Sequence, residues 1–237
     1  MKGGFGSCRL HTMSINIVNK IDNLVKVQHV LVSVSDKTDL EHFVPELLDI
    51  NPEIHFLSTG GTFSKLKEIL GTNWKSSLTQ VSDYTGQPET QGGLVKTLDF
   101  KIYLGLLTET YNDAHQADLQ RTSAVPIDMV VVNLYPFQQT IAKQDTTPEM
   151  ARGNIDIGGP CMIRASAKNH LRVASVVDPA DYPAIISCLK NNNGCTTLDE
   201  RYKLACKAFG HTAEYDAAIA EYLTSRSFDV VRRCYSL

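Results

Sequence analysis

The stretch VLVSVSDKTDLEHFVPELLDINPEIHFLSTGGT, residues 30–62, decides the fold of this chain. Its first residues, 30–34, are rich in valine, which is typical of a buried strand. A second apolar run at 54–57 leads into Gly60-Gly61 and then into a segment with apolar residues at helical spacing. The strand–loop–helix unit therefore occurs twice in succession, which indicates an α/β sheet.

The rest of the chain continues this alternation of strands and helices. Thr38 and Glu41 have the spacing of a capping box, and Pro45 is expected to kink or shorten the helix that follows. The run at 129–134 is nearly continuous in valine, as in a strand buried on both faces. The other predicted elements are helices that begin at Thr147-Pro148, Asp178-Pro179 and Thr197, a helix over 162–168 and a strand over 173–177. We predict an α/β fold, a doubly wound and mostly parallel sheet with C-terminal helices.

The composition limits the class of protein. The 237 residues are 43% hydrophobic, enough for one domain with a full core, which we assign to residues 27–225 between an N-terminal tail (1–26) and a C-terminal extension (226–237). A net charge of −3 provides no broad cationic field for nucleic acid or anionic lipid. The six cysteines form no CxxC pair, so we expect free thiols in a reducing compartment. Without an apolar span or a secretory signal, we expect a cytoplasmic protein with no membrane or nucleic-acid partner.

Two predicted strand ends carry polar loops of the kind that bind phosphate. The first combines hydroxyls, a lysine and the open amides of a helix N-terminus. In the second, two glycines allow the backbone to turn its amides toward an anion. Ordinary helix capping explains the first loop equally well, and a glycine pair alone is weak evidence for the second. Because both loops lie at one edge of the sheet, a single phosphorylated ligand can bridge them. The loop residues are Ser33, Ser35, Asp36, Lys37, Thr59, Gly60, Gly61 and Thr62.

Four further residues have chemical potential but also ordinary explanations. Lys96 follows a glycine pair in a polar region and can be a surface lysine. Tyr135 ends the buried strand at 129–134, where a tyrosine is more often part of the core. Asp156 can cap the next helix, and Lys168 can complement the dipole of that helix. Taken one at a time, these residues identify no activity.

A set of motifs resembles one enzyme family over residues 30–223. The strings are SVSDKT, STGGT, VSDYTG, VKTL, VVVNLYPF, NIDIGGP, AKNH and KAFGHTAEYDAAIAEYL. In this order and spacing they resemble the IMP cyclohydrolase domain of the bifunctional AICAR transformylase/IMP cyclohydrolase family of purine biosynthesis. The resemblance implies a methylglyoxal-synthase-like fold and dehydrative closure of 5-formamidoimidazole-4-carboxamide ribotide (FAICAR) to IMP. It implies no metal and no organic cofactor.

The resemblance also implies partners and site residues. It implies a homodimer, and because the transformylase half has no counterpart in this sequence, a separate AICAR transformylase is a candidate partner. The implied catalytic residues are Lys96, Tyr135, Asp156 and Lys168. The implied contacts to the purine ribotide are Ser35, Asp36, Lys37, Thr59, Gly60, Gly61, Thr62, Lys96, Thr97, Asn133, Asp156, Ile157 and Gly158, to which the first loop adds Ser33.

The implied reaction explains why such residues are needed. The carboxamide nitrogen attacks the formyl carbon within one molecule, so the enzyme mainly fixes a reactive rotamer and supplies charge and protons. A donor to the oxyanion-like adduct is worth about 3–4 kcal/mol, and Lys168 or amides near Gly158 suit that role. Asp156 would hold the carboxamide N–H, while Tyr135 and a lysine would transfer protons. Two lysines that share a closed site lower each other's pKa, which is a reason to have both Lys96 and Lys168.

The sequence departs from the family pattern near Lys96. The family usually reads GGRVKTLHP followed by a second histidine, whereas this chain has Leu94, Asp99 and Tyr103 in place of an arginine and two histidines. Leu94 cannot hydrogen-bond a nucleotide, and Asp99 introduces an anion near Lys96. Three hypotheses stay open: a monofunctional IMP cyclohydrolase, a cyclohydrolase-like enzyme for a related ribotide, and a non-catalytic regulatory protein that binds purine nucleotides. Retention of the four catalytic positions favours an enzyme.

Overall fold

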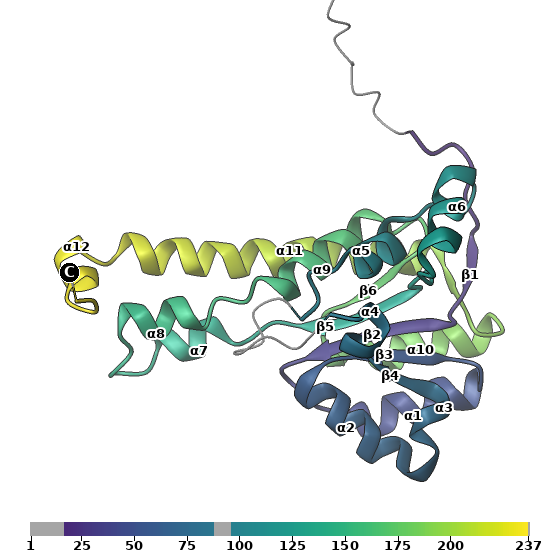
Figure 1. Cartoon of the computed structure of the whole chain (residues 1–237), viewed down its shortest axis with the longest axis horizontal. Helices are drawn as coiled ribbons and strands as arrows, with labels where there is room; N and C mark the ends of the chain where they lie inside the picture. Colours follow the sequence, from purple (N-terminus) through teal and green to yellow (C-terminus); the bar gives the residue numbers. More distant parts are fainter. Residues whose placement is uncertain (1–16, 88–95, 237) are drawn as a thin grey trace, which may run out of the picture.

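A five-stranded parallel sheet forms the centre of the molecule (Figure 1). The computed structural model describes residues 17–87 and 96–236. The strands run in the order β4-β3-β2-β5-β6, so the chain starts in the middle and winds outward in both directions. This order confirms the doubly wound parallel sheet. The strands are β2 (His29–Val34), β3 (His55–Ser58), β4 (Leu78–Gln80), β5 (Met129–Asn133) and β6 (Ala174–Val176).

Helices cover both faces of this sheet, and the strand residues alternate between two cores. Val30, Val32 and Val34 of β2 belong to one core, whereas Leu31 belongs to the other. Both faces are apolar because helices cover both, which explains the continuous valine runs. The first core is closed by α1 (Leu40–Ile50), α2 (Gly60–Leu70) and α10 (Tyr182–Asn191), and the second by α5 (Phe100–Leu107), α9 (Gly158–Lys168) and α11 (Leu198–Thr224). The described residues also form α3 (Trp74–Ser77), α4 (Val81–Thr85), α6 (Asp113–Thr122), α7 (Phe137–Ile141), α8 (Pro148–Gly153) and α12 (Phe228–Arg232).

The helix starts test the capping predictions. The Thr147 and Thr197 hydroxyls accept hydrogen bonds from the third amide of their helices, as expected of N-caps. The predicted capping box of Thr38 is wrong, because its amide and hydroxyl both donate to Asp36 Oδ1 and α1 begins after Asp39. Of the two effects predicted for Pro45, a kink or a shortened helix, the shortening does not occur, since α1 continues to Ile50 with the proline inside it.

The N-terminal segment differs from the predicted tail. Residues Leu24–Lys26 form β1, which pairs antiparallel with β7 (Cys195–Thr197). The fully buried guanidinium of Arg201 donates to the carbonyl oxygens of Asp22 and Asn23, and also to that of Thr196. Distant residues therefore hold this segment in place, and no local sequence pattern reveals such partners.

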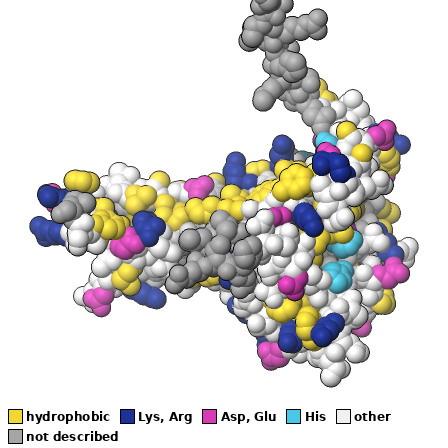
Figure 2. Space-filling view, in the orientation of Figure 1, with side chains coloured by type: hydrophobic (Ala, Val, Ile, Leu, Met, Phe, Trp, Pro, Cys, Tyr) yellow, Lys and Arg dark blue, Asp and Glu magenta, His cyan; other side chains and the backbone are white. Residues whose placement is uncertain are grey.

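The second half of α11 extends beyond the sheet as an arm that packs beside α7, with α12 against α8 (Figure 1). The ring of Phe137 in α7 lies edge-on to Tyr215 and Tyr222 of α11, with centroids 6.1 and 5.9 Å away. Hydrophobic side chains gather along this arm (Figure 2), and Phe228 and Leu223 are exposed there. None of the helices in the described ranges is long and apolar enough to cross a membrane.

Candidate functional site

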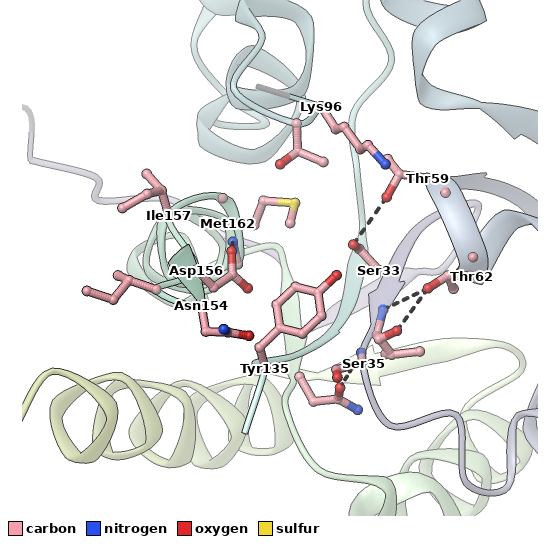
Figure 3. A pocket seen from close by; sticks show the side chains of 18 of the residues that line it. Ser33, Ser35, Thr59, Thr62, Lys96, Tyr135, Asn154, Asp156, Ile157 and Met162 are labelled. Atoms are coloured by element: carbon pink, nitrogen blue, oxygen red, sulfur yellow. Dashed lines mark hydrogen bonds between the residues drawn. The ribbon is translucent and has the colours of Figure 1, made fainter. Parts of the chain in front are cut away.

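A cavity of about 460 Å³ opens at the carboxyl ends of β2, β3 and β5. The order of the sheet reverses between β2 and β5, and doubly wound sheets bind ligands at such a point. The two strand-end loops form one wall and the segment between α8 and α9 forms the opposite wall (Figure 3). The cavity brings together these sequence-predicted residues: Ser33, Ser35, Lys37, Thr59, Gly60, Gly61, Thr62, Lys96, Thr97, Asn133, Tyr135, Asp156, Ile157 and Gly158.

The first wall has the character of an anion site. The Thr62 hydroxyl accepts from Val34 N at 3.1 Å and donates to Val34 O at 3.0 Å, which joins the start of α2 to the end of β2. The Ser33 and Thr59 hydroxyls lie 3.3 Å apart. The first amides of a helix have no intrahelical partner, and the first turn of α2 contains no acidic residue. This helix N-terminus therefore offers N–H donors and a partial positive charge to an anion.

Lys96 lies directly over the start of α2. A Cβ atom added to Gly60 would be 3.2 Å from Lys96 Nζ, and Gly60 has a φ of 50°. Glycine therefore serves two needs here, a left-handed backbone and a close approach by an ammonium group. The Lys37 ammonium instead donates to the carbonyl oxygens of Val34 and Ser35 at 3.5 and 3.3 Å.

The loop after β2 differs from its predicted role in one respect. The amides of Ser35 and Asp36 both donate to Asn133 Oδ1, at 2.7 and 2.9 Å, so they are occupied rather than open. The Asp36 carboxylate lies outside the cavity and accepts two hydrogen bonds from Thr38, which lower its pKa. Asn133 and Asp36 thus shape the loop, and Asp36 is not positioned to contact a ligand in the cavity.

The opposite wall presents a carboxylate and a phenol. Asp156 Oδ1 accepts a hydrogen bond from Gly159 N at 2.9 Å. Burial raises the pKa of the Asp156 carboxyl, and the amides of Gly159 and Gly158 oppose this shift. Tyr135 is 59% exposed, and its ring projects into the space between Asp156 and the first wall (Figure 3). An acceptor and a potential proton donor therefore face the anion site across the cavity.

The two glycines that begin α9 allow close packing at this wall. A Cβ atom on Gly158 would lie 2.7 Å from Thr97 Oγ1, and one on Gly159 would collide with Asp156 Oδ2. The sequence predicted this helix over 162–168, but α9 begins at Gly158, so the glycine pair forms its first turn. Its role is to let the Thr97 segment and the Asp156 carboxylate approach the helix end.

Lys168 is not brought to the cavity. It is exposed and is the last residue of α9, whereas Asp156 precedes the first residue of the same helix. An eleven-residue helix is about 16 Å long at 1.5 Å per residue. Lys96 and Lys168 therefore do not share a closed site within one chain.

The departures from the family pattern have local explanations where they are described. The Asp99 carboxylate accepts from Lys101 N at 2.8 Å and caps α5. The hydroxyl of Tyr103, on α5, is buried beside Cys161, and burial raises the pKa of this tyrosine. Leu94 lies outside the described residues. Asp99 and Tyr103 thus serve the start and the packing of one helix.

Sequence reasoning missed some residues of the cavity. Met162 lies one turn after Gly158, on the same face of α9, so helical spacing from the glycine pair could have identified it. Asn154 also lines the cavity, and its side chain donates to Met150 O at 2.7 Å. No motif signals Asn154. Within residues 17–87 and 96–236, no group of three or more His, Cys, Asp or Glu side chains is arranged to hold a metal ion.

Comparison with known proteins agrees with this architecture. Residues 39–161 match the family model of the MGS-like domain, and residues 166–235 match that of the AICARFT/IMPCHase bienzyme. The chain belongs to the MGS-like domain family, and its C-terminal part matches the AICARFT/IMPCHase bienzyme family. The first match covers most of the sheet and the cavity, and the second covers β6, α10, α11 and α12. The family and the fold expected from the motifs are confirmed.

Individual relatives are similar over most of the chain. The bifunctional purine biosynthesis protein PurH of Bacillus subtilis (strain 168) is 47% identical over 199 residues, which are 84% of this chain and 37% of that protein. The chain therefore spans well under half the length of this relative. A solved structure titled "Crystal structure of ForH" has a TM-score of 0.68 and 29% sequence identity. That match covers 82% of this chain and 98% of the ForH chain.

Proposed function

We propose that the chain is an IMP cyclohydrolase, a hydrolase of the class that acts on cyclic amidines, and that it converts FAICAR to IMP with loss of water. One observation carries the proposal: a single cavity joins an anion-binding wall to a wall with Asp156 and Tyr135. A ribotide also has two chemically different ends, a phosphate that suits the first wall and a reactive heterocycle that suits the second. The similarity to PurH, a bifunctional purine biosynthesis protein by name, supports a substrate from purine biosynthesis.

The fit of such a ligand follows from the two walls. The cavity volume of about 460 Å³ lies within the range of roughly 300–1,000 Å³ for small-molecule sites. The phosphate would accept hydrogen bonds from the first amides of α2 and a charge-assisted bond from Lys96. The imidazole would then lie near Tyr135, Asp156 and Met162, on the opposite wall.

Ring closure needs one new C–N bond and the loss of one oxygen as water. The carboxamide nitrogen attacks the formyl carbon, and Asp156 accepts the N–H proton that the nitrogen loses. The N-terminal end of α9, which lines the cavity, would stabilise the developing oxyanion with its partial positive charge. The adduct oxygen takes the proton held by Asp156 and becomes a hydroxyl. Tyr135 delivers a second proton as the C–O bond breaks and water leaves, and the tyrosinate takes the formamido N–H proton as the C=N bond forms. A carboxyl whose pKa is raised by burial is a stronger base than an exposed aspartate, which suits this role.

The test offers FAICAR to the purified chain and follows IMP formation by absorbance. Asp156→Asn is the matched control, because it keeps the side-chain shape and the acceptor for Gly159 N but cannot take a proton. We expect turnover by the wild type and loss of at least about 100-fold in the variant. Turnover no higher than that of the variant contradicts the proposal, and IMP binding without turnover would indicate a regulatory nucleotide-binding protein instead.

Lys168 requires a second chain if it acts as the resemblance implies. It ends α9 at a distance from its own cavity, so we propose a homodimer in which Lys168 serves the partner's site. Exposed apolar residues on the arm, among them Leu223 and Phe228, suit an interface between copies.

Complementation tests this arrangement. Lys96→Ala and Lys168→Ala variants, each inactive alone, are unfolded, mixed and refolded together. Random pairing should restore both lysines at about a quarter of the sites. A Lys168→Ala variant with full activity, or a mixture that stays inactive, contradicts the proposal.

A further inference from the structure

The long helix α11 makes a direct contact with the second wall of the cavity. Tyr215 lies in the second half of α11 and is 9% exposed. Its hydroxyl oxygen accepts a hydrogen bond from the backbone N of Asp156 at 2.8 Å. This hydrogen bond to α11, called the anchor below, therefore holds the main chain of Asp156, whose carboxylate faces the cavity.

The ring of the same tyrosine supports a second part of the site. It lies edge-on to Phe137, which follows Tyr135 and Pro136 at the end of β5. Tyr222, two turns further along α11, also lies edge-on to the Phe137 ring. The two tyrosines share the packing role, but only the Tyr215 hydroxyl bonds to Asp156.

We propose that Tyr215 is a positioning residue that fixes the Asp156 carboxylate for the ring-closure chemistry, an inference that rests on the proposed function. Hydrogen bonds to both its main chain and its side chain define the place of Asp156. Tyr215 fixes its main-chain amide, and Gly159 N, at 2.9 Å, fixes its side chain. The residue is thus held at both ends, between the long helix on one side and the start of α9 on the other.

Close packing leaves little space for Asp156 to move between its hydrogen bonds with Tyr215 and Gly159. A single Cβ atom on Gly159 would collide with Asp156 Oδ2 and would lie 2.6 Å from Leu134 Cδ2. Any shift of the Asp156 backbone must therefore move the carboxylate relative to the cavity. A misplacement of about 1 Å at a reacting group is enough to reduce a rate by about 100-fold.

The test compares Tyr215→Phe with Tyr222→Phe in the full chain. Both substitutions keep the ring against Phe137 and remove one hydroxyl. The Tyr222 hydroxyl is buried without a hydrogen-bond partner in the part of the chain that the structure describes, so its loss breaks no bond. For Tyr215→Phe we expect kcat for FAICAR to fall by at least about 10-fold, with KM within about 3-fold of the wild type. Tyr222→Phe should keep both constants within about 2-fold.

The split between kcat and KM separates positioning from a general loss of structure. The phosphate contacts lie on α2 and Lys96, which Tyr215 does not touch, so ribotide binding should persist. Equal losses in both variants would reduce Tyr215 to a packing residue, and wild-type constants in Tyr215→Phe would also overturn the inference.

Amide hydrogen exchange tests the anchor without any turnover. The Asp156 amide should exchange at least about 10-fold faster in Tyr215→Phe than in the wild type and remain slow in Tyr222→Phe. If the wild type fails to convert FAICAR, the proposed function fails whatever the exchange result. If the wild type is active and the Asp156 amide is equally protected in both variants, only the positioning role fails.

Discussion

The two ends of the central sheet use charged side chains in opposite ways. At the amino end, the buried guanidinium of Arg172 donates to Asp128 Oδ1 at 3.0 Å and to the carbonyl oxygens of Thr108 and Ile127. At the carboxyl end, Lys96 and Tyr135 are exposed at the rim of a cavity. The charged pair at the amino end is satisfied by the protein itself, whereas Lys96 and Tyr135 at the carboxyl end face the cavity. The contrast separates a region built for stability from one built for a ligand.

The largest expected effect is at the amino end. Asp128→Ala leaves Arg172 buried without its counter-ion and removes the acceptor of the Gln28 and His29 amides. We expect the free energy of unfolding, measured with urea, to fall by about 3–5 kcal/mol. IMP affinity of the remaining folded protein, measured by calorimetry, should not change.

An exposed ion pair provides the control for this substitution. Glu46 Oε2 accepts from Lys190 Nζ at 2.6 Å, but about half of each side chain is exposed to solvent. Glu46→Ala should therefore cost at most about 1 kcal/mol. If Asp128→Ala and Glu46→Ala lower the free energy of unfolding equally, burial does not make the Asp128–Arg172 pair more important for stability than an exposed pair.

Lys96→Met is the corresponding change at the carboxyl end. Loss of a charged donor to phosphate should weaken IMP binding by about 1.5–3 kcal/mol in calorimetry. The free energy of unfolding should stay within about 0.5 kcal/mol of the wild type, because Lys96 is exposed. Lys143→Met, an exposed lysine outside the cavity, should alter neither quantity. A destabilised Lys96→Met protein with normal IMP affinity would reverse the proposed contrast.

Gly60→Ala should have a smaller effect, and it should alter both the free energy of unfolding and the position of Lys96. The left-handed φ of 50° costs a residue with a Cβ about 1–2 kcal/mol, and that Cβ would also press against Lys96 Nζ. Gly61→Ala is the matched control, because its Cβ would meet no atom within 4 Å. Urea denaturation should show Gly60→Ala destabilised and Gly61→Ala unchanged or stabilised by about 0.4–1 kcal/mol. The reverse order would contradict the backbone argument.

The sequence predicts the parts of this fold that depend on neighbouring residues. Valine runs identify β2 and β5, and the caps at Thr147 and Thr197 depend on amides three residues away. Strand β1 escaped prediction because its partners, β7 and Arg201, lie at the other end of the chain. Long-range pairing leaves no local periodicity to detect.

The sequence predicted which residues line the cavity better than it predicted the hydrogen bonds among them. Parallel strands end at one edge, so the two loops and Asn133 had to meet there. That Asn133 occupies the Ser35 amide instead of a ligand depends on a tertiary contact, which no motif encodes. Lys168 is different, because the rise of a helix already separates it from Asp156. The family resemblance implied that Lys168 takes part in the reaction, but it did not indicate that Lys168 lies away from the cavity of its own chain.

The smallest expected effect concerns the cost of keeping a carboxylate in the cavity wall. Burial raises the pKa of Asp156 above its unfolded value, so the folded state prefers the protonated form. The protonated Asp156 carboxyl therefore contributes most to the free energy of unfolding at pH values below its pKa in the unfolded chain. This contribution is lost as the pH rises through its pKa in the folded protein. At neutral pH the ionised Asp156 therefore destabilises the fold, unlike the paired charges at the amino end.

Asp156→Asn should remove this cost while keeping the acceptor for Gly159 N. We expect the variant to be more stable than the wild type at neutral pH, by an amount within about 1 kcal/mol. The advantage should vanish in acid, where the wild-type carboxyl is also neutral. Urea denaturation at both pH values measures the difference. A variant less stable than the wild type at neutral pH would mean that the ionised carboxylate gains more from its amide contacts than it loses by burial.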